Sequence, residues 1–135
     1  MSFREKITLH QADLFLNETT ADLIVCNPPW LPARPTSEIE KALYDENSQM
    51  LKSFLKKAPA HLNSKGEVWL ILSDLAERLE LRAPNELEEL FHDASLKVLE
   101  TRTTTPTHKK AKSFEDALGP FRAQEVTRLF RLSRS

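Results

Sequence analysis

Five stretches of the chain carry the hydrophobic pattern of β-strands. They are residues 7–10, 22–27, 67–73, 96–105 and 125–132. The first and the last alternate apolar and polar side chains, which is the period of a strand with one buried face. Residues 22–27 form a compact run rich in branched apolar side chains, which predicts a strand covered on both faces.

A period of three to four residues marks the helical segments between these strands. Apolar residues at this spacing run from Met50 to Leu62 and predict an amphipathic helix. Residues 74–81 and 84–94 predict a pair of helices, with Pro84 suited to the first turn of the second. Ser37 and Glu40 have the spacing of a capping box, so a short helical turn is expected to start there. A tight turn is expected at residues 64–66.

The order of these elements indicates the fold class. Strands and helices alternate over most of the chain, which is typical of an α/β fold with a mainly parallel sheet and helices on both faces. The last two strands have no helix between them, so we expect them to pair antiparallel at the edge of the sheet. In the apolar strand 67–73, Trp69 is expected in the core, and Leu96, Val98 and Leu99 are expected to pack from strand 96–105.

Composition is that of a single globular domain. The chain has 135 residues, of which 40% are hydrophobic and 29% are charged. Its 19 basic and 20 acidic residues nearly cancel, so no overall charge favours a nucleic acid or a membrane. No apolar run reaches the length of a membrane span, and no signal-peptide pattern opens the chain, so a cytoplasmic protein is expected.

One four-residue motif carries chemistry. Asn27, Pro28, Pro29 and Trp30 directly follow the apolar run 22–27. In open α/β sheets, ligands bind beyond the carboxyl ends of the strands. A rigid Pro-Pro pair fixes backbone carbonyls there, and Asn27 adds a side-chain acceptor. This combination suits a planar amino group. The two acceptors would bind its two hydrogens, and the aromatic ring would cover its face.

This motif resembles the signature of Rossmann-like, S-adenosylmethionine-dependent methyltransferases that modify planar nitrogens. The family includes the DNA adenine, release-factor glutamine and ribosomal RNA guanine enzymes. The likeness covers nearly the whole chain and corresponds to the carboxyl-terminal half of the family's domain. It implies that the asparagine side chain and the first proline carbonyl accept hydrogen bonds from the target amine.

The resemblance assigns roles to particular residues. Asn27 and Pro28 would be catalytic by orienting the amine, and Pro29, Trp30 and Tyr44 would border the substrate, with Trp30 stacking on it. Asp13, at the end of the first predicted strand, would lie near the adenine of S-adenosylmethionine, and Asn27 would also face this cofactor.

The sequence departs from the family in its glycines. Relatives begin with a strand and a glycine-rich loop that wraps the methionine part of the cofactor, whereas this sequence has no glycine before Gly66. Residues 1–135 are therefore interpreted as one partial methyltransferase domain with an incomplete cofactor site. A complementing amino-terminal half is an expected partner, with a nucleic acid or a protein as the substrate.

Simpler readings stand beside this one. Cys26, the only cysteine, is expected to be a small buried residue, and it excludes an internal disulfide. The four histidines show no metal-ligand spacing, so no metal site is predicted.

Two other classes of function remain open. An inactive module would self-associate as a homodimer through exposed sheet edges. A nucleic-acid-binding fragment would use the arginines of the last strand and a basic loop. The charges of this loop are explained equally well by its lying in solvent. The basic residues of this loop are His108, Lys109, Lys110 and Lys112.

Overall fold

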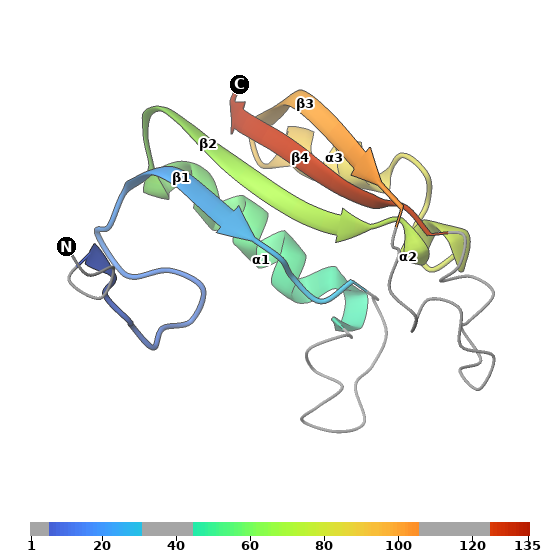
Figure 1. Cartoon of the computed structure of the whole chain (residues 1–135), viewed down its shortest axis with the longest axis horizontal. Coiled ribbons are helices and arrows are strands. Elements are labelled where there is room, and N and C mark those ends of the chain that lie inside the picture. Colours follow the sequence, from blue (N-terminus) through green and yellow to red (C-terminus); the bar gives the residue numbers. More distant parts are fainter. Residues whose placement is uncertain (1–5, 31–44, 106–124) are drawn as a thin grey trace.

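A computed structural model describes residues 6–30, 45–105 and 125–135, which form a four-stranded mixed sheet with helices (Figure 1). The strands lie in the order β1-β2-β4-β3. Their bounds are β1 Ala21–Cys26, β2 Leu62–Ser73, β3 Leu96–Thr104 and β4 Thr127–Arg134. β1 and β2 are parallel, while β4 runs antiparallel to both β2 and β3. The fold is α/β, as predicted, and the closing antiparallel pair with β3 at the edge is confirmed.

The helices connect the strands along one side of the sheet. Their bounds are η3 Glu46–Ser48, α1 Gln49–Lys57, η4 Ala58–His61, α2 Leu75–Arg78 and α3 Glu86–Asp93. α1 begins where its amphipathic pattern begins, and the carboxylate of Asp45 accepts the free backbone N–H groups of Met50 and Leu51 at 2.8 and 3.0 Å. The two predicted helices after β2 are also present, in shorter form.

One hydrophobic core fills the space between this helical layer and the sheet. Val68, Leu70 and Leu72 alternate along β2 and are fully buried. They meet apolar side chains from the inner faces of α1 and α3, among them Leu51 and Phe91. The apolar side chains, spaced every two residues on the strand and every three to four residues on the helices, therefore form one core between the two layers.

β2 is longer than predicted and contains a bulge. Leu62 pairs with Ala21 and Glu67 pairs with Leu23, so five steps along β2 match two along β1. The predicted turn at residues 64–66 is this bulge, inside a strand that starts at Leu62. Lys65 takes the left-handed conformation, with φ of 65°, while Gly66 does not. Gly66 is needed for space, because a Cβ there would lie 2.9 Å from the carbonyl oxygen of Asn63.

The predicted strand at residues 7–10 is wrong, since this segment has no secondary structure. Ile7 and Leu9 keep their alternation, but their side chains are 61% and 91% exposed. No other described strand lies beside them, and alternation alone does not supply the hydrogen-bonding partner that a strand requires.

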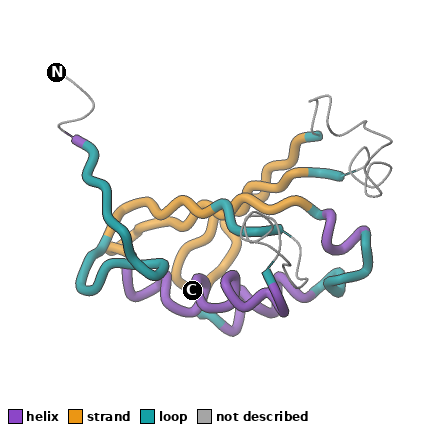
Figure 2. The backbone as a smooth tube through the Cα atoms, turned by 90° about the horizontal axis from the view of Figure 1, so that it is seen from below, coloured by secondary structure: helices purple, strands orange, loops and turns teal. Residues whose placement is uncertain are grey.

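The predictions of a mainly parallel sheet and of helices on both faces are also wrong for the described residues. Only the β1–β2 pair is parallel, because β4 inserts antiparallel between β2 and β3. η3, α1, η4, α2 and α3 all lie on one face, as Figure 2 shows. The strand at residues 22–27 was expected to be covered on both faces, yet Leu23 and Val25 on the open face are 44% and 58% exposed.

The open face and β3 account for three further differences. Trp69 is half-buried on the open face, where its indole N–H donates to the Glu67 carboxylate at 3.0 Å. Val98 and Leu99, predicted to pack, are exposed on β3, while Leu96 is buried. A register irregularity between Val98 and Glu100 breaks the alternation that the prediction assumed. The capping box of Ser37 and Glu40 lies outside the described residues.

Candidate functional site

The candidate site begins where β1 ends. Because β1 and β2 are parallel and Cys26 pairs with Leu70, the carboxyl ends of both strands meet at the same edge of the sheet. Pro28 stops the ladder since it has no N–H, and it is buried. Asn27 is exposed just before it. The loop thus presents an amide at the position where open α/β sheets bind ligands.

Trp30 holds the amide of Asn27. The indole Nε1–H of Trp30 donates to Oδ1 of Asn27 at 3.0 Å. An indole N–H only donates, so it fixes which end of the amide is the oxygen. The Trp30 ring is partly buried and packs against the core, which anchors this donor. The amide oxygen has two lone pairs, so one remains for a second donor.

Cys26, the residue before this loop, is buried, as predicted. Burial raises the pKa of its thiol to about 11. The thiolate is the reactive form of cysteine, so Cys26 stays protonated near neutral pH and is no nucleophile.

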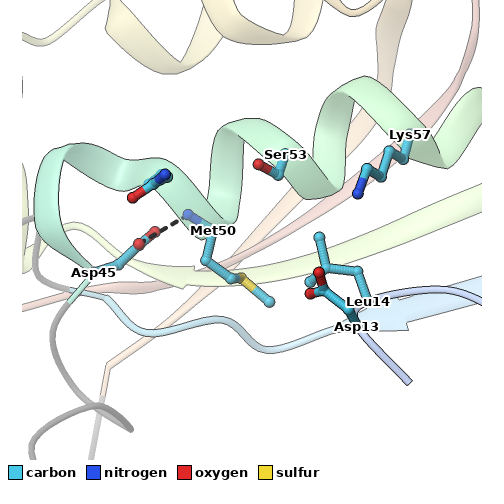
Figure 3. A pocket seen from close by; sticks show the side chains of 7 residues that line it. Asp13, Leu14, Asp45, Met50, Ser53 and Lys57 are labelled. Atoms are coloured by element: carbon cyan, nitrogen blue, oxygen red, sulfur yellow. Dashed lines mark hydrogen bonds between the residues drawn. The ribbon is translucent and has the colours of Figure 1, made fainter.

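Asp13 lies in a different place from Asn27. It lines a polar cavity of about 320 Å³ that runs along α1 and is shown in Figure 3. The other lining residues are Leu14, Asp45, Gln49, Met50, Ser53 and Lys57. Asp45 contributes the carboxylate that also accepts from the first turn of α1. Asn27 is not among the described residues that line this cavity, and Tyr44 lies outside the described residues.

The described residues do not by themselves fit S-adenosylmethionine. A glycine-rich loop lets the backbone approach a ligand closely. The glycine that the structure describes, Gly66, instead lies inside the sheet, where the carbonyl oxygens of Ala21 and Asn63 occupy the space that a side chain would need. The cavity at Asp13 offers carboxylates for hydroxyl or amino groups, but it also contains the cation of Lys57. No described backbone segment therefore supplies the wrap that the resemblance implies for the methionine part.

A buried polar cluster that the sequence did not predict lies at the carboxyl end of β2. Ser73 is fully buried and its hydroxyl donates to the Glu125 carboxylate, while it accepts from the N–H of Leu75 at 3.0 Å. Asp74 accepts the backbone N–H of Val126 at 2.7 Å. The position of Ser73 and Asp74, at the carboxyl end of a buried parallel strand, was the available signal. Their partners, Glu125 and Val126, lie 52 residues away in the sequence, and no local pattern marks them.

Two arginines and two glutamates continue this cluster. Arg128 donates to both carboxylate oxygens of Glu77 at 3.2 Å and to the carbonyl of Ser73 at 3.0 Å. The side chain of Arg82 is 1% exposed and lies 3.6 Å from the same carboxylate. A second carboxylate, that of Glu86, lies 3.5 Å from Nε of Arg82. The two cations are therefore opposed by two carboxylates, and the cluster joins α2 to β4.

The other arginines of the last strand are also engaged inside the molecule. Arg131 donates to both carboxylate oxygens of Glu67, at 2.9 and 3.0 Å. Arg134 donates to the carbonyls of Leu62 and Pro59 at 3.0 and 2.9 Å. The Glu67 carboxylate opposes the charge of Arg131, which leaves less of it for a polyanion, whereas Arg134 contacts neutral carbonyls. The basic loop with Lys109, Lys110 and Lys112 lies outside the described residues.

Comparison with known proteins adds no identification. No protein-family model matches the chain, and no curated protein matches it. Within the described ranges, no three His, Cys, Asp or Glu side chains are grouped to hold a metal ion. No helix in those ranges is long and apolar enough to cross a membrane.

Proposed function

We propose that the loop from Asn27 to Trp30 binds a planar amino group and orients it for methylation. The chain would then be the acceptor-binding part of an S-adenosylmethionine-dependent amino-methyltransferase. The observation that carries this proposal is the exposed Asn27 amide, held in one orientation by Trp30 at the carboxyl end of a parallel strand.

The sheet supports the same proposal. The resemblance implies that the strand before the Asn-Pro-Pro loop is parallel to the next strand. It also implies that the last two strands pair antiparallel. The order β1-β2-β4-β3 has both features, with the motif directly after β1. Sheet topology alone is shared by unrelated functions, so the weight rests on the loop.

The loop offers two acceptors at neighbouring positions, the Asn27 Oδ1 and the Pro28 carbonyl. Pro28 has no N–H, so its backbone contributes only a carbonyl. The remaining lone pair on Asn27 Oδ1 and this carbonyl would take the two hydrogens of an amine. The nitrogen would then be held away from the plane of its ring or carbonyl, and its lone pair would be free to react. Such catalysis would work mainly through position: the methyl group would leave the sulfonium as a neutral thioether forms, and the methylated nitrogen would release its extra proton to solvent.

The residues that the structure describes leave the site for the methyl donor incomplete. S-adenosylmethionine would supply an electrophilic methyl group, and the described residues lack the glycine cradle for it. We therefore propose that this chain acts together with a glycine-rich segment of another polypeptide or of a longer protein. Protein glutamine, DNA, RNA and small-molecule amines all satisfy the acceptors of the loop.

Amine binding at Asn27 is tested by nuclear magnetic resonance. The side-chain amide signals of Asn27 and the indole signal of Trp30 are followed while adenine, cytosine, guanosine or N-acetylglutamine amide is added to the labelled chain. At least one of these amines is expected to shift both signals, because both groups share one hydrogen bond.

Matched ligands and variants make the result specific. Purine replaces adenine without its amino group and is expected to leave the signals in place. Asn27→Ala removes the acceptor, and Asn17→Ala changes an exposed asparagine of another loop as the control. If no amine shifts the signals more than its amine-free counterpart, the proposal fails.

A further inference from the structure

We infer that the chain pairs with a second copy of itself, residues 6–10 of each protomer adding a strand to the free edge of β1 in the other. The inference is independent of the proposed function, because it rests on the edge of the sheet and not on the Asn27 loop.

The donor is a segment outside the sheet whose apolar side chains have no described partner. Ile7 and Leu9 alternate with polar residues, as in a strand, and Leu9 is 91% exposed. Leaving a large apolar side chain in water forgoes roughly 1.5–3 kcal/mol of burial. Figure 2 shows the segment rising on the side of the sheet opposite the helices. It therefore stands clear of the chain's own core.

Contacts further along the chain hold this segment away from its own sheet. The ring of Phe15 stacks on Phe54, with centroids 5.3 Å apart, and on His61, with centroids 4.4 Å apart. The ring nitrogen Nδ1 of His61 lies 2.6 Å from the carbonyl oxygen of Thr19. Residues 13–19 are thereby fixed against α1 and η4, and the segment before them projects.

The acceptor is the edge of β1. β1 is the first strand in the sheet order, and β2 is its only strand neighbour among the described residues. It has no proline and no lysine, which are the usual protections of an edge. On its open face Leu23 and Val25 are 44% and 58% exposed.

The opposite edge of the sheet is protected. β3 carries Lys97, Glu100 and Arg102 and has an irregularity at Leu99. Charges and bulges of this kind discourage the addition of a strand. The two edges therefore differ, and only β1 is a good acceptor.

Donor and acceptor match in pattern and in charge. In a parallel alignment, the offset that sets Ile7 beside Leu23 also sets Leu9 beside Val25, on one face. The same offset sets Lys6 beside Asp22, the only charged residue of β1. Reciprocal exchange between two copies makes each of these contacts twice, once in each direction. The result is a closed two-fold dimer with no unpaired donor or acceptor left over.

Light scattering after size exclusion tests the inference on the 135-residue chain. The expected mass is that of a dimer at high concentration. Leu9→Lys and Val25→Lys each change an exposed side chain, so both variants are expected to keep the circular dichroism of the wild type. Each is expected to weaken the dimer about tenfold or more, a change of roughly 1.4 kcal/mol. Val98→Lys, at an exposed position on β3, is the matched control and is expected to remain dimeric.

Mixing the two variants identifies the exchange itself. Leu9→Lys has an intact acceptor, and Val25→Lys has an intact donor. Each alone is expected to dissociate at a concentration where the wild type is still dimeric, and the mixture is expected to form a heterodimer with one intact pair. A wild-type chain that stays monomeric at high concentration contradicts the inference. A dimer that survives Leu9→Lys, or variants that fail to complement, also contradict it and assign the contact to another surface.

Discussion

The indole Nε1–H of Trp30 and the amide Oδ1 of Asn27 are 3.0 Å apart, and this hydrogen bond determines how the candidate site presents its amide. Phenylalanine or tyrosine at position 30 would provide a ring but no donor at the same place. Tryptophan therefore gives the loop an anchor in the core and a clamp on Asn27. In the proposed function, Trp30 positions the acceptor in addition to the predicted stacking on substrate.

Trp30→Phe isolates this clamp. It keeps an aromatic ring for packing and stacking but removes the N–H. We expect a loss of about 1 kcal/mol or less in the free energy of unfolding, since the bond is exposed. The Asn27 amide is expected to become free to rotate, which weakens amine binding and broadens its nuclear magnetic resonance signals. Unchanged Asn27 signals in Trp30→Phe would show that the clamp has no effect.

Gly66→Ala tests the bulge in β2. The added Cβ would lie 2.9 Å from the Asn63 carbonyl oxygen and 3.1 Å from that of Ala21, so backbone must move. We expect the free energy of unfolding to fall by about 1–3 kcal/mol, measured by urea denaturation. Ser64→Ala, at an exposed position in the same bulge, is the control. Equal stability of the two variants would refute the steric role of Gly66.

Glu77 is expected to be essential to the buried cluster. Glu77→Gln removes the carboxylate that faces both Arg82 and Arg128, and Arg82 is 1% exposed. Removing one partner of a buried ion pair costs up to about 3–5 kcal/mol, and Glu86, 3.5 Å from Nε of Arg82, offsets part of this, so a clear loss of stability in denaturant is predicted. Glu80→Gln, at an exposed position nearby, should be neutral. Adding Arg82→Met to Glu77→Gln should restore part of the loss, and a further drop would contradict this account.

Acid is expected to weaken the open face through Glu67. Hydrogen bonds from Arg131 and then from the Trp69 indole lower the pKa of Glu67 below its usual 4.5. A carboxyl with a lower pKa in the folded state adds stability above the unfolded value and loses it as pH falls through the folded value. The stability that Glu67 contributes should therefore disappear as pH falls below about 4.5.

Urea unfolding as a function of pH checks this sign. Glu67→Gln should be less stable than the wild type at neutral pH, and the two curves should converge in acid. Glu88→Gln, exposed on α3, serves as the matched control and should follow the wild type throughout. A constant difference between Glu67→Gln and wild type at all pH values would exclude the linkage.

The sequence predicted the elements better than it predicted their neighbours. Periodicity located α1 and the four strands of the sheet, because local patterns at two and at three to four residues depend only on the chain nearby. It also led to Asn27 and Pro28, since a proline pair after an apolar run marks the end of a strand. The antiparallel pairing of β3 with β4 followed from the missing helix between them.

Long-range features were not accessible in this way. Leu23 and Val25 have the side chains of a doubly covered strand, and their exposure depends on which helices cross which face. The bond of Ser73 to Glu125 joins residues 52 positions apart, and no local pattern indicates it. Alternation at Ile7 and Leu9 predicted a strand, but a strand also needs an edge to join, and the chain's own sheet leaves that edge unpaired by any described strand.

Methyl transfer measures the central claim most directly. The chain is combined with a glycine-rich amino-terminal half-domain and S-adenosylmethionine labelled on its methyl group, and label is followed into RNA, DNA, protein and small-molecule amine pools. We predict label in one pool, its loss of at least about a hundredfold in Asn27→Ala, and its retention in Asn17→Ala. Transfer that persists unchanged in Asn27→Ala, or no label in any pool, would contradict the assignment of this loop as an amine-orienting site.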